Sequence, residues 1–180
     1  MTTTDDPTAQ TLTWVKPSPL HGRYELREGE DVRATLQRRS AFGTLADAEA
    51  AEGRWTFKRV GFLPPRVTVR DAGANTEAAV FQVHWDGSGE LTLNDGRRFM
   101  WQAANFWHSQ WTWTDAEGTP LLHFRPVHLS WHEQAQVEVS PAALVLPECS
   151  LLALLGWYLT LLRAADANNS AGAIAVAASS

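Results

Sequence analysis

The sequence predicts a mainly β protein: a closed antiparallel barrel of about twelve strands with a central hydrophobic α-helix near the C-terminus. Two observations predict this fold. Short runs of alternating apolar and polar residues, separated by turn residues, follow one another along the chain, as is typical of an all-β sandwich or barrel. After them comes Leu151–Leu162, which is apolar on every side, and a helix with no polar face has to be buried all round.

The alternating runs are the predicted strands, and one of them, near Phe42, is weak. In order they are Thr11–Val15, Gly22–Arg27, Asp31–Gln37, Phe42–Asp47, Arg54–Val60, Arg66–Asp71, Ala78–Trp85, Glu90–Leu93, Arg97–Ala103, Gln110–Thr114, Pro120–Arg125 and Gln134–Ser140. Turn signals at Glu28–Asp31, Asn94–Gly96 and Asp115–Gly118 join neighbouring runs, so consecutive strands are expected to pair mostly as a meander.

Alternation also predicts which side chains share a face of the sheet. The buried face is expected to hold Trp55, Phe57, Val67, Val69, Phe81, Val83, Trp85, Phe99, Trp101, Ala103, Trp111, Trp113, Val137 and Val139. The solvent face is expected to hold Thr56, Lys58, Thr68, Arg70, Gln82, His84, Thr112, Thr114, Gln136 and Glu138.

The last element is predicted to be a helix over Pro147–Ala165. Proline and an acid suit the first turn of a helix, and Arg163 would lie in the last turn, where a cation is favoured. A single domain is therefore expected over residues 11–166. Residues 1–10 are expected to be a disordered lead-in and residues 167–180, rich in Ala, Ser and Asn, a disordered tail.

The apolar run suits a barrel interior better than a bilayer. It has twelve residues, interrupted by Gly156 and Thr160, whereas a membrane span needs about 20. Twelve residues of helix rise about 18 Å, close to the height of a barrel of tilted strands, and barrels of more than about eight strands leave space inside. A membrane anchor is the alternative.

Composition excludes some classes of protein. The net charge of −5 argues against a general nucleic-acid binder, and the single cysteine excludes an intrachain disulfide. The first residues lack the features of a secretory signal, so a cytoplasmic location is expected. No motif of a catalytic nucleophile or a phosphate-binding loop occurs. We therefore expect no enzyme, no cofactor and a monomer.

Three stretches resemble the tubby C-terminal-like superfamily, nearest its LURP-one-related and phospholipid-scramblase-like branches. They are Tyr24–Val32, Trp111–Gly118 leading into Leu121–Arg125, and the helix Leu151–Leu162. The resemblance implies a closed barrel threaded by its last helix and a non-enzymatic role, often at membranes, with phosphoinositide binding in the tubby branch. The chain lacks the Cys-rich segment and the acidic calcium loop of a scramblase, so scrambling is not carried over.

One predicted hairpin is the candidate lipid contact. Its outer face would carry Arg54, Lys58, Arg66 and Arg70, with Arg59 near a tip that contains Phe62 and Leu63. Apolar side chains backed by cations are what peripheral proteins present to anionic bilayers. In the alternative, Phe62 and Leu63 fold over the barrel mouth while the arginines pair with Asp71, Glu52 or other neighbours.

Other reactive or aromatic residues have simpler interpretations. The histidines, His84, His108, His123, His128 and His132, are expected to be solvated rather than metal ligands. Cys149 is expected to be a small buried residue, although a helix start can lower the pKa of a thiol. Trp101, Trp111 and Trp113 are expected to pack in the core, with Trp107 and Trp131 freer to be exposed.

The sequence therefore predicts a non-catalytic binding or scaffold module that makes a peripheral contact with anionic phospholipid. The alternatives are a carrier of a small molecule or lipid in the barrel mouth and a protein anchored in a membrane by its C-terminal helix. No protein partner is indicated.

Overall fold

Twelve antiparallel strands close into a barrel in the order β1-β12-β11-β10-β9-β8-β7-β6-β5-β4-β3-β2. The structure is a computed structural model and describes residues 9–40, 43–74, 76–127 and 133–178. Each strand pairs with its neighbours along the chain, and β1 pairs with β12 to close the barrel. The predicted fold class is confirmed.

The elements are β1 Gln10–Val15, β2 Arg23–Glu28, β3 Asp31–Arg38, β4 Ala46–Ala50, β5 Gly53–Val60, β6 Arg66–Asp71, β7 Glu77–Val83, β8 Gly89–Leu93, β9 Arg98–Ala103, β10 Trp111–Asp115, β11 Pro120–Pro126, β12 Glu133–Val139, α1 Pro141–Leu144 and α2 Cys149–Ala178.

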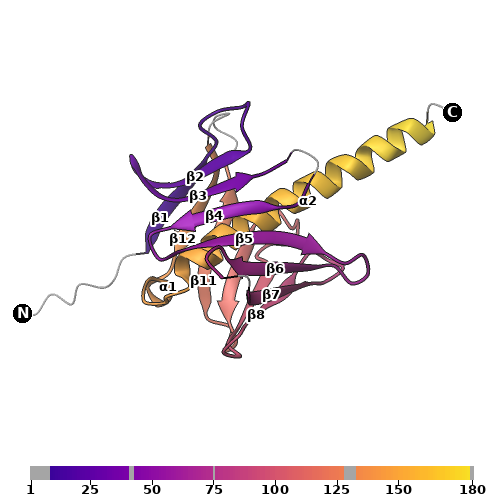
Figure 1. Ribbon diagram of the computed structural model, residues 1–180. Coiled ribbons are helices and arrows are strands. Elements are labelled where there is room, and N and C mark those ends of the chain that lie inside the picture. The colour runs from indigo at the N-terminus through magenta and orange to yellow at the C-terminus, as the bar shows by residue number, and fades with distance from the viewer. Residues whose placement is uncertain (1–8, 41–42, 75, 128–132, 179–180) are drawn as a thin grey trace, which may run out of the picture.

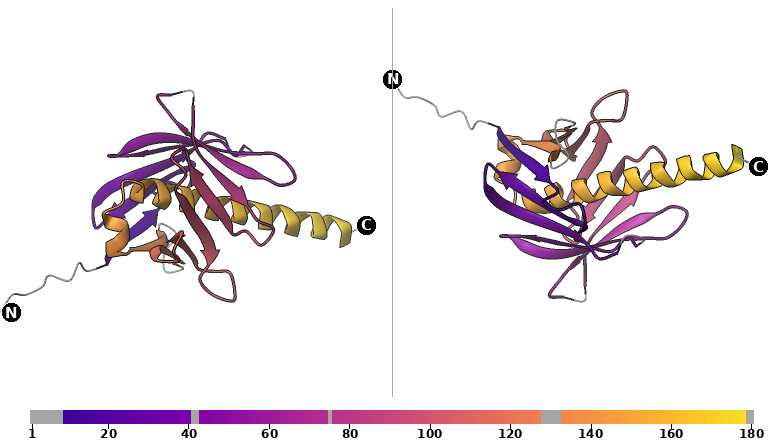
Figure 2. Two further views of the ribbon diagram at one scale, coloured as in Figure 1. Left: turned by 90° about the horizontal axis from the view of Figure 1, so that it is seen from below. Right: turned by 90° about the horizontal axis from the view of Figure 1, so that it is seen from above.

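Helix α2 runs through the barrel and continues beyond it (Figure 1). Every residue from Leu151 to Leu159 is buried, Gly156 included. A helix buried on all sides needs no polar stripe, which is why this segment is apolar at every position. Figure 2 shows the C-terminal half of the same helix projecting away from the sheet.

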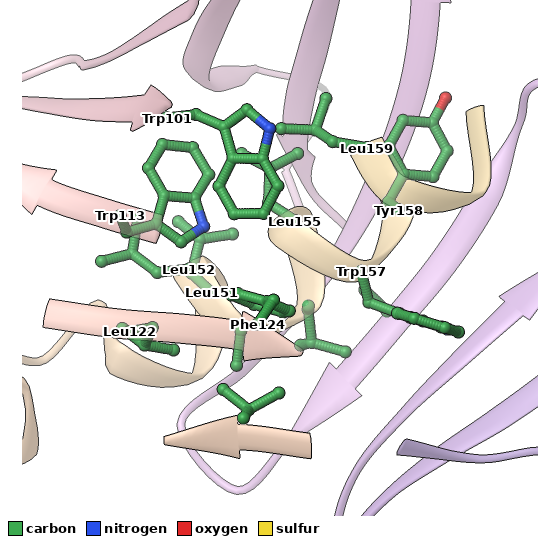
Figure 3. Close-up of a cluster of buried hydrophobic side chains, with 14 of the residues drawn as sticks. Trp101, Trp113, Leu122, Phe124, Leu151, Leu152, Leu155, Trp157, Tyr158 and Leu159 are labelled. Atoms are coloured by element: carbon green, nitrogen blue, oxygen red, sulfur yellow. The ribbon is translucent and has the colours of Figure 1, made fainter. Parts of the chain in front are cut away.

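Aromatic side chains fill the space between the strands and the helix. Trp157 of α2 stacks on Trp14 of β1 with ring centroids 5.5 Å apart, and Tyr158 packs against Phe57 at 5.4 Å. On the other side of the helix, Trp101 lies 5.0 Å from Trp113 and 5.5 Å from Trp111. Figure 3 shows Trp101 and Trp113 beside the leucines of α2. The predicted core role of these tryptophans is confirmed.

Gly156 permits the closest approach of helix and sheet. A Cβ atom at this position would lie 2.5 Å from Phe124 Cζ and 2.8 Å from Trp113 Nε1, both well inside van der Waals contact. The glycine in the apolar run is therefore a packing requirement of the barrel.

The two ends of the barrel are distinguished by the helix. We call the end at which α2 begins the base and the end at which it leaves the rim. Because β1 starts at the base and every strand is antiparallel to the next, the rim holds the connections β1–β2, β3–β4, β5–β6, β7–β8, β9–β10 and β11–β12. The contacts agree: Glu148 pairs with Arg97 at the base, and Asp166 pairs with Arg59 at the rim.

Several predicted positions on the sheet need correction. Trp85 was expected inside, but β7 ends at Val83 and Trp85 lies exposed in the turn that follows. Thr68, Thr112 and Thr114 were expected to face water but are buried. Thr112 Oγ1 donates to the carbonyl of Leu122 at 2.9 Å, which satisfies its hydroxyl.

The fourth strand and the C-terminal region also differ from the prediction. The fourth strand is Ala46–Ala50 rather than Phe42–Asp47, and residues 41–42 lie outside the described residues. Helix α2 does not end at Ala165 but continues to Ala178, so the predicted disordered tail is wrong over residues 167–178. Alanine is the strongest helix former, and no proline breaks the run, so the helix propagates. The short α1 was not predicted.

Candidate functional site

The β5–β6 hairpin displays its cations as the alternation predicts. Lys58 pairs with Thr68 and Thr56 with Arg70 across the two strands, while the alternate residues Phe57 and Val69 are buried. The side chains of opposite parity to Phe57 and Val69 therefore form the outer face, where Arg54, Lys58, Arg66 and Arg70 are all exposed.

The tip of this hairpin is apolar and open. Phe62 is 90% exposed and Leu63 85% exposed, so neither side chain is buried in the barrel mouth. Among the described residues, Lys58 and Arg66 have no ion-pair partner, whereas Arg54 lies 3.6 Å from Glu49. The hairpin thus combines two exposed apolar side chains with two cations, Lys58 and Arg66, that have no carboxylate partner among the described residues.

The seven predicted lipid-binding residues do not form one group. Lys58, Phe62, Leu63 and Arg66 gather at the rim, near the tip. Arg54 and Arg70 lie toward the base, because β5 starts and β6 ends there, and Arg54 is seven residues from Gly61, about 23 Å along an extended strand. Only the four residues near the tip can meet one surface together with the apolar loop.

Arg59 has a different role from the other cations. It has the parity of Phe57, so its side chain points toward the barrel axis at the mouth. There its guanidinium Nη1 donates to both carboxylate oxygens of Asp166 of α2, at 3.0 and 2.8 Å. This ion pair joins the last residues of β5 to the helix as it leaves the barrel.

A pocket of about 500 Å³ opens at the rim between α2 and the β5–β6 and β7–β8 connections. Leu63, Phe81, Val83, Leu159 and Leu162 give it apolar walls. A second pocket of about 330 Å³ lies on the Tyr158 side of the helix. Because α2 fills the barrel axis, a ligand has room in these mouth pockets and not along the centre of the barrel.

Two cations line the larger pocket, Arg59, which pairs with Asp166, and Arg163. The Arg163 guanidinium lies 4.5 Å from the ring centroid of Trp111 and donates to the carbonyl of Asp86 at 3.1 Å. Among the described residues it has no carboxylate partner, since the Asp86 carboxylate accepts from the hydroxyl of Ser88 at 2.6 Å. That hydrogen bond lowers the pKa of Asp86, so its carboxylate stays ionised.

Three more aromatic side chains stand exposed at the rim, and sequence reasoning identified only one of them. Trp107 was expected to be freer, and it is exposed; Phe106 beside it and Trp85 in the next connection were not predicted. The sequence Asp86-Gly87 directly after Trp85 is typical of a turn, and it indicates that Trp85 lies at the end of the strand rather than inside the barrel. Trp131 lies outside the described residues.

The described histidines and cysteine have no arrangement suited to chemistry. His123 Nε2 lies 3.1 Å from Gln110 Oε1, and burial lowers the pKa of this histidine. Among the described residues no three His, Cys, Asp or Glu side chains are grouped to hold a metal ion, and His128 and His132 lie outside them. Burial raises the pKa of the Cys149 thiol to about 11, the opposite of an activated thiol.

One segment of α2, Cys149–Ala171, is long and apolar enough to cross a membrane by length and composition. Half of its most apolar stretch is buried inside the barrel. To span a bilayer, this segment would have to leave the core that Leu151–Leu159 fills. The feature is therefore weak evidence for a transmembrane anchor.

The molecule is therefore a closed β-barrel with helix α2 along its axis. Its rim, where α2 leaves the barrel, carries exposed apolar side chains and cations. Comparisons with protein-family models, with curated proteins and with solved structures find no match to this chain.

Proposed function

We propose that this chain is a non-catalytic binding module that makes a peripheral contact with anionic phospholipid through the tip of the β5–β6 hairpin. The observation that carries the proposal is the pair of exposed side chains Phe62 and Leu63, backed by Lys58 and Arg66. Apolar side chains and cations of this kind contact a ligand or surface without taking part in a reaction, and this supports a binding role rather than a catalytic one.

The physical basis is the sum of two modest effects. Apolar side chains gain free energy when they enter the boundary between headgroups and acyl chains. Each cation held near an anionic leaflet adds about 1 kcal/mol. Lys58 and Arg66 form no ion pair with a carboxylate among the described residues, so no such pair reduces their attraction to an anionic surface.

The proposal agrees with the membrane role that the tubby-like resemblance implies. The closed barrel threaded by a C-terminal helix is the architecture that this resemblance predicts. Membership of the superfamily and a cytoplasmic location stay predictions.

Sedimentation with vesicles of phosphatidylcholine and phosphatidylserine tests the proposal. The double variant Lys58→Glu/Arg66→Glu is expected to lose vesicle binding. The matched control Arg54→Glu/Arg70→Glu reverses two charges on the same outer face but at the base, and it is expected to bind like the natural chain. Equal binding of both variants, or no binding by the natural chain, would contradict the proposal.

A second function is favoured by one observation, the pocket of about 500 Å³ at the barrel mouth. This volume lies in the range of small-molecule sites. Its apolar walls and the unneutralised Arg163 suit an amphiphile with an anionic head. In this function the protein is a carrier, and native mass spectrometry of the protein as purified is expected to show a bound ligand that the Arg163→Gln variant releases.

A further inference from the structure

The exposed apolar side chains of the molecule are concentrated at one end. Nine large apolar side chains are exposed among the described residues, and six of them belong to rim connections. All four aromatic ones are at the rim, between 81% and 99% exposed: Phe62, Trp85, Phe106 and Trp107. The exposed apolar side chains at the base are aliphatic: Val32, Leu144 and Val145.

Hydrogen bonds from polar side chains shape two of the rim loops that carry these aromatics. Asn105 Oδ1 accepts from the backbone N–H of Ser109 and Gln110, at 3.0 and 3.2 Å, which shapes the β9–β10 loop that carries Phe106 and Trp107. In the β7–β8 turn, Asp86 accepts from Ser88 N–H at 2.9 Å. The loops are thus internally fixed, and their aromatics need no rearrangement before they meet a surface.

Charge divides the barrel in the same direction. Counting the connections, the terminal residue of each strand and Glu148, the base carries ten acids and two bases, Arg97 and Arg98, with Arg54 and Arg70 one residue further into their strands. The connections and strand ends at the rim carry two acids, Asp86 and Glu133, and five bases: Lys16, Arg23, Arg38, Arg39 and Arg66. An anionic surface therefore attracts the rim and repels the base.

The end of α2 reaches beyond the rim on the same side. Figure 1 shows the β5–β6 connection on the side from which α2 projects. Twelve residues of α2 follow Asp166, a rise of about 18 Å. Asn168, Asn169 and Ser170 come first, and the stretch Ala171–Ala178 contains no polar side chain. Eight residues rise about 12 Å, less than half of a hydrocarbon core of about 30 Å.

From these observations we infer that the rim is a docking face for an anionic bilayer, with the aromatic loops at the level of the headgroups and the end of α2 inserted into one leaflet. The inference rests on the proposed function and deepens it. It fixes an orientation with the base and its acids facing the solvent and with the stretch Ala171–Ala178 in the bilayer.

The first test compares the two ends by vesicle sedimentation with phosphatidylcholine and phosphatidylserine. Trp85→Ser/Trp107→Ser is expected to lower the vesicle partition coefficient at least about tenfold, since each side chain loses the transfer free energy of a large aromatic group. Val32→Ser/Val145→Ser removes exposed apolar side chains at the base and is expected to change nothing. Thermal unfolding without vesicles is expected to be the same for both variants and the natural chain.

The second test measures depth in the bilayer. In a Cys149→Ser background, a fluorophore is attached to a single cysteine introduced by Val176→Cys, Trp107→Cys or Ala116→Cys. Nitroxide-labelled lipids are expected to quench the first label most deeply, the second near the headgroups, and the third, in the β10–β11 turn at the base, not at all.

The outcomes separate this inference from the proposed function. If the natural chain binds vesicles but neither the Val176 nor the Trp107 label is quenched, the hairpin alone makes the contact and the inference is wrong while the proposed function stands. If the natural chain ignores vesicles, the proposed function fails and the inference with it. A concentration-dependent dimer that the Trp85→Ser/Trp107→Ser variant abolishes, without vesicle binding, would assign the rim to a second copy and overturn the inference.

Discussion

Helix α2 has two halves that differ in both composition and surroundings: a Leu-rich segment inside the barrel and an Ala-rich segment beyond it. From Leu151 to Leu159 it is enclosed by the strands, and from Ala164 to Ala171 nearly every residue is exposed. The first half fixes the fold, because its side chains pack against those of the strands in the core of the barrel. The second half adds almost nothing to the core, so its helical state and apolar end call for a role outside the barrel. One element can therefore carry stability and function in separate segments.

The largest expected effect comes from Gly156→Leu in the enclosed half. A side chain at this position meets Phe124 and Trp113 at under 3 Å, so the variant is expected not to fold. The control Ala171→Leu adds a leucine side chain to the same helix at an exposed position, and should leave the melting temperature unchanged. Circular dichroism during heating measures both. A natural melting curve for Gly156→Leu would show that helix and sheet are not in close contact.

A smaller effect is expected from Tyr158→Phe, at the end of the enclosed half. The Tyr158 hydroxyl donates to the carbonyl of Thr44 at 2.5 Å. Its loss leaves that carbonyl unpaired and is expected to cost about 1–3 kcal/mol of the free energy of unfolding. Denaturation with urea at neutral pH measures this cost, and a cost near zero would mean that water replaces the hydroxyl.

The same residue gives the stability a pH dependence. Burial raises the pKa of Tyr158 to about 12 from its ordinary value of 10.0. Between these pH values the unfolded phenol loses its proton while the folded one keeps it, so the free energy of unfolding is expected to fall as the pH rises from 10 to 12. Cys149 contributes in the same direction from pH 9 upward, so the measurement uses a Cys149→Ser background. In that background, Tyr158→Phe should make the curve less steep above pH 10, while Tyr24, whose pKa burial also raises, keeps part of the slope.

The smallest effect is expected where the two halves meet, at the pair of Arg59 and Asp166. The side chain of Asp166 is 56% exposed, so Asp166→Asn is expected to change the free energy of unfolding by no more than about 1 kcal/mol. High salt should reduce this difference further, because exposed ion pairs are screened. A larger, salt-independent loss would place the pair in the core rather than at its edge.

Much of the fold was predictable because alternation and turn residues are local signals. Strands with large apolar residues, such as Arg66–Asp71, were predicted with the right ends. The strand Ala46–Ala50 was misplaced, because Ala, Asp and Glu are poor strand formers and its pairing with β3 and β5 decides it. The sequence predicts the end of α2 at Ala165 because the Ala, Ser and Asn content of residues 167–180 is typical of disorder, but alanine also favours helix and α2 continues to Ala178.

The candidate site was predictable only in part. The sequence placed Phe62, Leu63 and their flanking cations on one hairpin, a local feature. It did not show that Arg54 and Arg70 lie toward the other end, or that Arg59 meets Asp166, since this pair is 107 residues apart in the chain. The gathering of Trp85, Phe106 and Trp107 at the rim depends on the closure of the whole barrel, which no local pattern records.

The most direct test of the division of α2 is a chain that ends after Asp166. The account predicts that this variant unfolds at the same temperature as the full chain, because it keeps the enclosed half and the ion pair with Arg59. It also predicts that binding to vesicles containing phosphatidylserine falls markedly, because the inserted segment is gone. Lower thermal stability, or unchanged vesicle binding, would contradict the account.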